Sequence, residues 1–175
     1  MTTSATRPST TRLAPAPGTA QAVMTDLREF LAFKIGNEEY GVDILRVQEI
    51  RTYEKPTTIA NATGELLGVM NLRGVIVPIL DLRLKLGQPA VQYDHLKVVI
   101  VLHIGQRTVG VVVDGVSDVL TLEREQLRPV PALRGNVKPE HLLAIGSVGP
   151  RMLILLDIEK FLARPVAGEA LAATH

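Results

Sequence analysis

An internal duplication constrains the fold of this chain more than any other feature of its sequence. The segment Phe30–Ile50, FLAFKIGNEEYGVDILRVQEI, matches Val99–Val119, VIVLHIGQRTVGVVVDGVSDV, without a gap. Gly41 falls opposite Gly110 in this alignment. Each copy has the pattern of a strand, a glycine-containing turn, a second strand and a short segment that leaves the hairpin. The chain is therefore expected to contain two structurally related units.

The duplication continues toward the carboxyl end of each copy. Val75–Leu86, VIVPILDLRLKL, matches Arg151–Leu162, RMLILLDIEKFL. Asp81 and Asp157 occupy equivalent places, each at the end of an apolar strand and before a short amphipathic segment. Two such acids are compatible with a paired-carboxylate site, but an N-cap on each following helix accounts for both without catalysis. We therefore expect two helix caps.

Each repeated half supplies several short strands joined by turns that contain glycine, with little helix. The halves span about residues 30–86 and 99–162. This pattern predicts an all-β fold of two small related barrels, which share apolar surface and leave a groove at their junction. It does not determine whether strands cross between the units. Outside the predicted domain, residues 28–164, we expect a disordered tail over residues 1–27 and a flexible tail over residues 165–175.

The stretch GVMNLRGVIVPILDLR places one arginine between two apolar runs. Val69–Leu72 and Val75–Leu80 are predicted to form the strands of a hairpin, and Arg73 and Gly74 its connection. Gly74 is expected to take the positive φ that one central position demands, while Arg73 keeps an ordinary conformation and projects from the tip. On local grounds alone, a solubilising edge charge is the commoner explanation for such an arginine. The alternative is a contact to a partner.

The composition excludes several classes of protein. The 175 residues contain no cysteine, so thiolate catalysis, disulfides and cysteine-based zinc sites are ruled out. The formal charge is only +1 and aromatic residues make up 3%, whereas a small barrel that binds nucleic acid needs a basic surface and stacking rings. A nucleic-acid-binding barrel is therefore kept only as the alternative hypothesis. The longest apolar stretch, Val98–Leu102, is strand-sized, so no membrane insertion is expected.

The residues that could support catalysis show no suitable spacing. The four histidines lack the HExxH or i,i+4 pattern of metal ligands. Ser117 and Ser147 miss the G-x-S-x-G elbow, and no phosphate-binding glycine loop leads from a strand into a helix. Asp114 and Asp118 fall short of a calcium loop. No enzyme activity, metal or cofactor is therefore predicted.

Three motifs together resemble the CheW-like domain family of bacterial chemotaxis coupling proteins: YGVDILRVQEI, NLRGVIVPILDLR and VGVVVDGVSDVL. The similarity runs in the same order along the chain, from about Phe30 to Leu162. The resemblance implies two intertwined SH3-like β-barrels and a non-catalytic scaffold. It further implies that the scaffold joins the signalling tips of methyl-accepting chemoreceptors to the regulatory domain of the histidine kinase CheA. The implied location is cytoplasmic, in receptor arrays at the inner membrane, and self-association into rings is left open.

The resemblance also implies where the partners bind. The receptor surface of the family is an apolar groove between the barrels with polar residues beside it. In this chain the receptor residues so assigned are Val47, Glu49 and Arg73. Gly68, at the start of the same hairpin, is added to them, although a tight backbone alone also accounts for a glycine there. The kinase in this family binds by pairing of like barrels, which no motif assigns to particular residues, and Gly110, Gly115 and Asp118 of the second copy are the candidate contributors. Turn and packing roles account equally well for the glycines of this second set.

Overall fold

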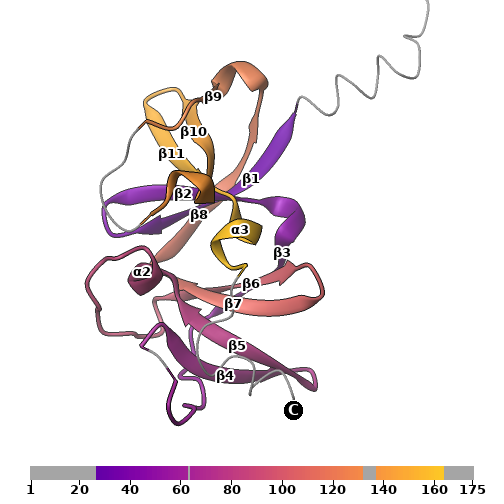
Figure 1. The fold of residues 1–175 in the computed structure, drawn as a ribbon, viewed down its shortest axis with the longest axis vertical. Helices are drawn as coiled ribbons and strands as arrows, with labels where there is room; N and C mark the ends of the chain where they lie inside the picture. The colour runs from indigo at the N-terminus through magenta and orange to yellow at the C-terminus, as the bar shows by residue number, and fades with distance from the viewer. Residues whose placement is uncertain (1–26, 63, 132–136, 164–175) are drawn as a thin grey trace, which may run out of the picture.

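The computed structural model describes residues 27–62, 64–131 and 137–163. Apart from Leu27, the predicted tails lie outside the described residues, as does residue 164 at the end of the predicted domain. Strands predominate in the described part, and its helices are short (Figure 1). The first repeated half contains β1 (Arg28–Ile35), β2 (Glu38–Asp43), η1 (Ile44–Arg46), β3 (Val47–Thr52), β4 (Leu66–Leu72), β5 (Val75–Asp81) and α2 (Leu82–Lys85). The second contains β6 (Val98–Ile104), β7 (Arg107–Val113), β8 (Gly115–Leu122), η2 (Arg124–Gln126), β9 (Leu127–Arg128), η3 (Pro139–His141), β10 (Leu142–Val148), β11 (Arg151–Leu156) and α3 (Ile158–Phe161).

The strands form two sheets, and each sheet takes strands from both repeated halves (Figure 1). One sheet has the order β8-β1-β2-β11-β10-β9 and the other the order β3-β6-β7-β5-β4. The hairpin β1–β2 of the first half thus joins β8–β11 of the second, while β6–β7 of the second half joins β3–β5 of the first. We call the two units the six-stranded barrel and the five-stranded barrel. The predicted all-β fold of two intertwined units is confirmed.

Glycine occupies both parallel strand pairs that join the two halves. β2 runs parallel to β11, with Gly41 opposite Leu155, and β7 runs parallel to β5, with Gly110 opposite Ile79. A Cβ atom at Gly41 would lie 2.6 Å from Leu155 Cδ2, and one at Gly110 would lie 2.6 Å from Ile79 Cδ1. Any larger residue would have to displace its neighbour across the junction. The glycine pair found in the duplication therefore marks two equivalent junctions.

Alternating side chains of the strands fill three apolar cores. On β1, Phe30 and Ala32 pack inside the six-stranded barrel, whereas Leu31, Phe33 and Ile35 pack between the barrels. This alternation is the period of two that a strand imposes on its side chains. The core of the five-stranded barrel consists of Leu72, Val77, Ile79, Val99, Val101 and Val112. The largest cluster is the one between the barrels, so each barrel depends on the other to bury its apolar surface.

Two equivalent aspartates cap the two short helices, as predicted. Asp81 accepts a hydrogen bond from the Leu84 N–H at 3.2 Å, and Asp157 accepts one from the Lys160 N–H at 3.2 Å. The two caps differ in burial. Asp81 is fully buried, its Oδ2 atom has no hydrogen-bond partner among the described residues, and burial raises the pKa of its carboxyl. Asp157 remains partly exposed.

The turn between β4 and β5 differs from the prediction at Arg73. Both Arg73 and Gly74 have positive φ, 53° and 88°, which is the backbone pattern of a type I′ hairpin turn. The expected ordinary conformation of Arg73 is wrong, because both turn types that match the strand twist, I′ and II′, need positive φ at the first central position, which Arg73 occupies. The Gly74 N–H donates to Asn71 Oδ1 at 2.8 Å and so helps to hold this turn.

Candidate docking surfaces

The turn residue Arg73 forms an ion pair with Glu49 in the five-stranded barrel. Glu49 lies on β3, and Arg73 lies at the tip of the β4–β5 hairpin, at the opposite edge of the sheet order. The sheet must therefore curl until its two edges meet. This curl brings together two predicted receptor residues that are distant in the sequence.

Glu49 is held between two arginines. Arg51 Nη1 donates to Glu49 Oε1 at 3.2 Å, and this hydrogen bond, together with the charge of Arg73, lowers the pKa of Glu49. The Arg73 side chain nevertheless remains 70% exposed. An anchored but exposed side chain is suited to binding, because part of the conformational entropy that a contact costs has already been lost.

Apolar side chains lie on the same elements as this ion pair. Val47, at the start of β3, packs partly buried against the core between the barrels. Ile50 of β3 and Val75 of β5 are exposed to 47% and 55%. Aliphatic and charged residues thus occur on the same strands, and a receptor site built from them stays a prediction.

Gly68, the fourth predicted receptor residue, has a structural role that requires no partner. Its φ is 151°, and a Cβ atom on it would lie 2.1 Å from the carbonyl oxygen of Thr57. Thr57 and Val69 exchange two backbone hydrogen bonds, of 2.9 and 2.8 Å. Gly68 thus allows the segment around Thr57 to pair with β4, and a role in receptor binding stays a prediction.

The second repeated half carries a counterpart of the Glu49 cluster. Asp118, which the duplication aligns with Glu49, lies on β8 and pairs with Arg151 at 2.9 Å. Arg151, at the start of β11, also pairs with Glu39 of β2. The hydrogen bond from Arg151 lowers the pKa of Asp118, and the two acids raise the pKa of Arg151.

The three predicted kinase residues lie at different depths. Asp118 is exposed, and Gly115 is half-buried at the start of the same strand, β8. Gly110 is buried in β7, where the close approach of Ile79 already accounts for a glycine. The structure therefore brings Gly115 and Asp118 together and places Gly110 in the interior.

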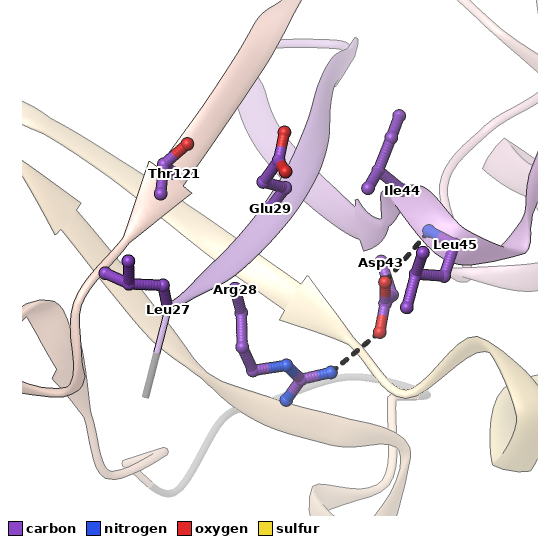
Figure 2. Close-up of a pocket in the computed structure, with 7 residues that line it drawn as sticks. All are labelled: Leu27, Arg28, Glu29, Asp43, Ile44, Leu45 and Thr121. Carbon is purple, nitrogen blue, oxygen red and sulfur yellow. Dashed lines mark hydrogen bonds and ion pairs between the residues drawn. The ribbon is translucent and has the colours of Figure 1, made fainter. Parts of the chain in front are cut away.

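A pocket of about 300 Å³ lies beside η1 and was not anticipated from the sequence. Its lining residues are Leu27, Arg28, Glu29, Asp43, Ile44, Leu45 and Thr121. Figure 2 shows Leu27 and Leu45 on either side, with the ion pair between Arg28 and Asp43, 2.9 Å long, between them. Leu45 is 84% exposed and Leu27 is 45% exposed. The sequence offered one indication of this pocket. The duplication aligns the aliphatic Leu45 with the acidic Asp114 of the other copy.

The described residues also bear on metals and membranes. Within residues 27–62, 64–131 and 137–163, no group of three or more His, Asp or Glu side chains is arranged to hold a metal ion. In the same part of the chain, no helix has both the length and the apolar character required to cross a bilayer.

Comparisons with known proteins agree with this architecture. The family model of the CheW-like domain matches residues 29–166. The chain is 60% identical to the chemotaxis protein CheW of Klebsiella aerogenes, over 78% of this chain and 82% of that protein. It is 34% identical to the chemotaxis protein CheW of Rhizobium meliloti, over 75% and 85%. The crystal structure of the scaffolding protein TtCheW from Thermoanaerobacter tengcongensis superposes with a TM-score of 0.71 at 23% identity, over 79% of this chain and 94% of that one.

Two intertwined SH3-like β-barrels are the fold that this chain shares with the scaffolding protein TtCheW. The chain belongs to the CheW-like domain family, as the family model and the curated relatives show. Its role is that of a chemotaxis coupling protein. The alternative of a nucleic-acid-binding barrel finds no support in these matches.

Proposed function

We propose that this protein couples the signalling tips of chemoreceptors to the histidine kinase CheA within receptor arrays at the inner membrane. Membership of the CheW-like domain family supports a chemotaxis scaffold, and the exposed surfaces of the two barrels supply sites for two partners. The functional domain is residues 28–164, and residues 1–27 and 165–175 are tails outside it. The observation that carries the proposal is the exposed Arg73, held by Glu49 beside aliphatic side chains.

The receptor site in this proposal consists of Val47, Glu49 and Arg73. A chemoreceptor tip is a helical hairpin, which presents an apolar stripe with polar side chains along its margins. Val47 and Ile50 supply aliphatic surface for the stripe, and the Arg73 guanidinium supplies hydrogen-bond donors for a carboxylate or carbonyl at its margin. The surface has no large aromatic anchor, so an isolated contact should have a dissociation constant of roughly 1 μM. Many parallel contacts would then stabilise an array.

Calorimetric titration with a receptor-tip fragment tests this site. Arg73→Glu should weaken binding about thirtyfold, which corresponds to about 2 kcal/mol, because the substitution reverses a charge at the centre of the contact. Arg151→Glu, the matched change in the other barrel, should leave receptor binding within about twofold of the wild-type value. Unchanged binding by a folded Arg73→Glu variant would move the receptor site elsewhere, and absence of binding by the wild type would contradict the proposed coupling function.

The kinase site in this proposal lies on the six-stranded barrel, at the pocket of Leu27 and Leu45. Pairing of like barrels buries aliphatic residues at strand ends and loops, and Leu45 is the most exposed large apolar side chain of the described residues. Thr121 connects the pocket to β8, the strand that also carries Gly115 and Asp118. These residues would form one continuous surface along the edge strand β8.

Binding of the CheA regulatory domain to Leu45→Asp tests this surface. The charge should weaken binding at least tenfold, because an aspartate would have to be desolvated in an apolar contact. Leu96→Asp is the control, since Leu96 is also highly exposed, at 70%, but lies outside the pocket. Equal binding by both variants would show that the kinase docks elsewhere, whereas retention of receptor binding by Leu45→Asp would confirm that the variant is folded.

A further inference from the structure

A second pocket, of about 410 Å³, lies where the two short helices approach each other, away from both proposed docking surfaces. Its lining residues are Lys85, Lys138, Glu140, His141, Lys160, Phe161 and Ala163. Three lysines face one glutamate in this set, whereas the whole chain has nearly equal numbers of basic and acidic residues. The pocket is therefore a local concentration of positive charge.

The duplication places equivalent residues face to face at this pocket. Lys85 ends α2, and Phe161, its counterpart in the second half, ends α3. Lys85 Nζ lies 5.6 Å from the centroid of the Phe161 ring, in a cation–π arrangement. The His141 ring meets the edge of the same Phe161 ring, with 5.5 Å between their centroids. The aromatic wall thus fixes one lysine and the histidine in position.

The cations of this pocket are only loosely paired. Lys85 Nζ and Lys160 Nζ each lie 3.8 Å from their carboxylate partners, Glu65 and Asp157, and His141 Nε2 lies 3.8 Å from Glu140. These separations exceed hydrogen-bond length, in contrast to the 2.9 Å between Arg28 and Asp43. The hydrogen-bond donors of the pocket are therefore still available for a ligand.

One nitrogen of a residue that lines the pocket lacks a hydrogen-bond partner among the described residues. His141 Nδ1 is buried and has no hydrogen-bond partner among the described residues. A buried polar atom without a partner carries a desolvation cost, which a ligand or an ordered water would relieve. This second observation distinguishes the pocket from a group of solvated surface lysines.

From this arrangement we infer that the pocket binds a small phosphate-bearing anion. Several ammonium groups around one cavity suit the charge of a phosphate better than that of a single carboxylate, and lysine binds phosphate as a compact point charge. Phe161 and Ala163 provide an apolar wall for the organic part of such a ligand. The phosphate could belong to a soluble molecule or to the headgroup of an anionic lipid, and the same basic cavity would hold either.

Titration of the whole protein with inorganic pyrophosphate at low ionic strength tests the pocket. The wild type should bind saturably, and the imidazole NMR signals of His141 should shift as it does. The double variant Lys138→Gln/Lys160→Gln should bind at least tenfold more weakly. The control is Lys34→Gln/Lys55→Gln, which changes the net charge equally at two exposed lysines outside the pocket and should bind within twofold of the wild type.

Vesicle sedimentation distinguishes the two sources of phosphate. Pocket-dependent binding to phosphatidylglycerol vesicles, absent with pure phosphatidylcholine and reduced by pyrophosphate, would assign a lipid headgroup. Pyrophosphate binding without vesicle binding would assign a soluble phosphate. The inference is wrong if the wild type binds neither probe, if both double variants lose binding equally, or if His141 does not respond to a bound probe.

Discussion

The two barrels are built from equivalent strands but carry exposed ion-pair clusters of opposite net charge. In the five-stranded barrel, one acid, Glu49, lies between Arg51 and Arg73. In the six-stranded barrel, one base, Arg151, lies between Asp118 and Glu39. The duplication has thus kept the backbone frame and an acid at the aligned positions Glu49 and Asp118, whereas two arginines accompany the first acid and one arginine with a second acid accompanies the other. Complementary charge governs partner choice, so two such surfaces favour two different partners.

The largest effect is expected where one barrel has a glycine and the other an alanine. The register between β4 and β5 shifts just before Gly68, and the register between β10 and β11 shifts just before Ala144. The two residues therefore occupy equivalent positions in the two barrels. Gly68→Ala should lower the free energy of unfolding by about 3 kcal/mol, because the Cβ atom would collide with the carbonyl oxygen of Thr57 in a backbone conformation that alanine rarely adopts. Urea denaturation measures the loss.

Ala144→Gly is the reciprocal change in the six-stranded barrel. It should cost only about 1 kcal/mol, the usual penalty for a more flexible backbone and a lost methyl group. Equal losses for the two variants would show that the contact between Gly68 and Thr57 has no special importance.

A charge exchange between Glu49 and Arg73 separates two roles of Arg73. The double variant Glu49→Arg/Arg73→Glu restores the ion pair with reversed polarity. If Arg73 contacts the receptor directly, the double variant should bind a receptor tip about as weakly as Arg73→Glu, roughly thirtyfold below wild type. Recovery of wild-type affinity would instead mean that the ion pair only shapes the barrel. Calorimetry gives both affinities.

The two helix caps provide a smaller contrast, which depends on pH. The raised pKa of Asp81 means that its folded state holds the proton more tightly than its unfolded state. The stabilising contribution is therefore complete below the ordinary pKa of about 4 and is lost as the pH rises through the folded-state value. Asp81→Asn keeps a cap and removes the buried charge, so it should stabilise the protein by about 1 kcal/mol at pH 7.

Asp157→Asn is the control for this cap, since Asp157 is partly exposed. Its stability should stay within about 0.5 kcal/mol of wild type at every pH. Thermal denaturation between pH 4 and pH 8 measures both variants, and a destabilised Asp81→Asn protein would show that the ionised carboxylate is required.

The smallest expected effect concerns the carboxylates of the two charge clusters. Asp118 owes its lowered pKa first to the hydrogen bond from Arg151, so Arg151→Gln should return the Asp118 pKa close to its ordinary range. Glu49 owes its lowered pKa first to Arg51, so Arg73→Gln should raise the Glu49 pKa only partly. Carboxyl NMR titrations report each pKa. A full return of the Glu49 pKa to its ordinary range in Arg73→Gln would show that Arg73, and not Arg51, is the main cause of the lowered value.

Much of the fold could be predicted because the two copies share the same alternation of apolar residues and the same glycines. Gly41 and Gly110 were visible as a pair before any strand was placed. The exchange of strands was not determined by the pattern, since equivalent hairpins from either half satisfy the same pairing. The conformation of Arg73 was missed because positive φ is uncommon outside glycine, and only the turn length required it.

The candidate sites were predictable to different degrees. Glu49 and Arg73 were singled out from motifs, but their ion pair depends on the curl of the sheet, which local sequence does not specify. Leu45 was missed because one exposed leucine among many aliphatic residues carries no periodic signal. Gly110 was assigned to a surface by position alone, and burial between neighbouring strands gives it a packing role.

The exchange of strands also has a consequence for synthesis on the ribosome. The hairpin β1–β2 emerges first, but Gly41 pairs with Leu155, near the end of the described chain. At typical translation rates, on the order of ten seconds pass between the two residues. During that interval β1 can already pair with β8 (Gly115–Leu122), but β2 lacks its parallel partner β11, so nascent molecules on neighbouring ribosomes could supply that strand to one another. Co-translational crowding therefore exposes this protein to mispaired dimers formed through the uncovered edge of β2.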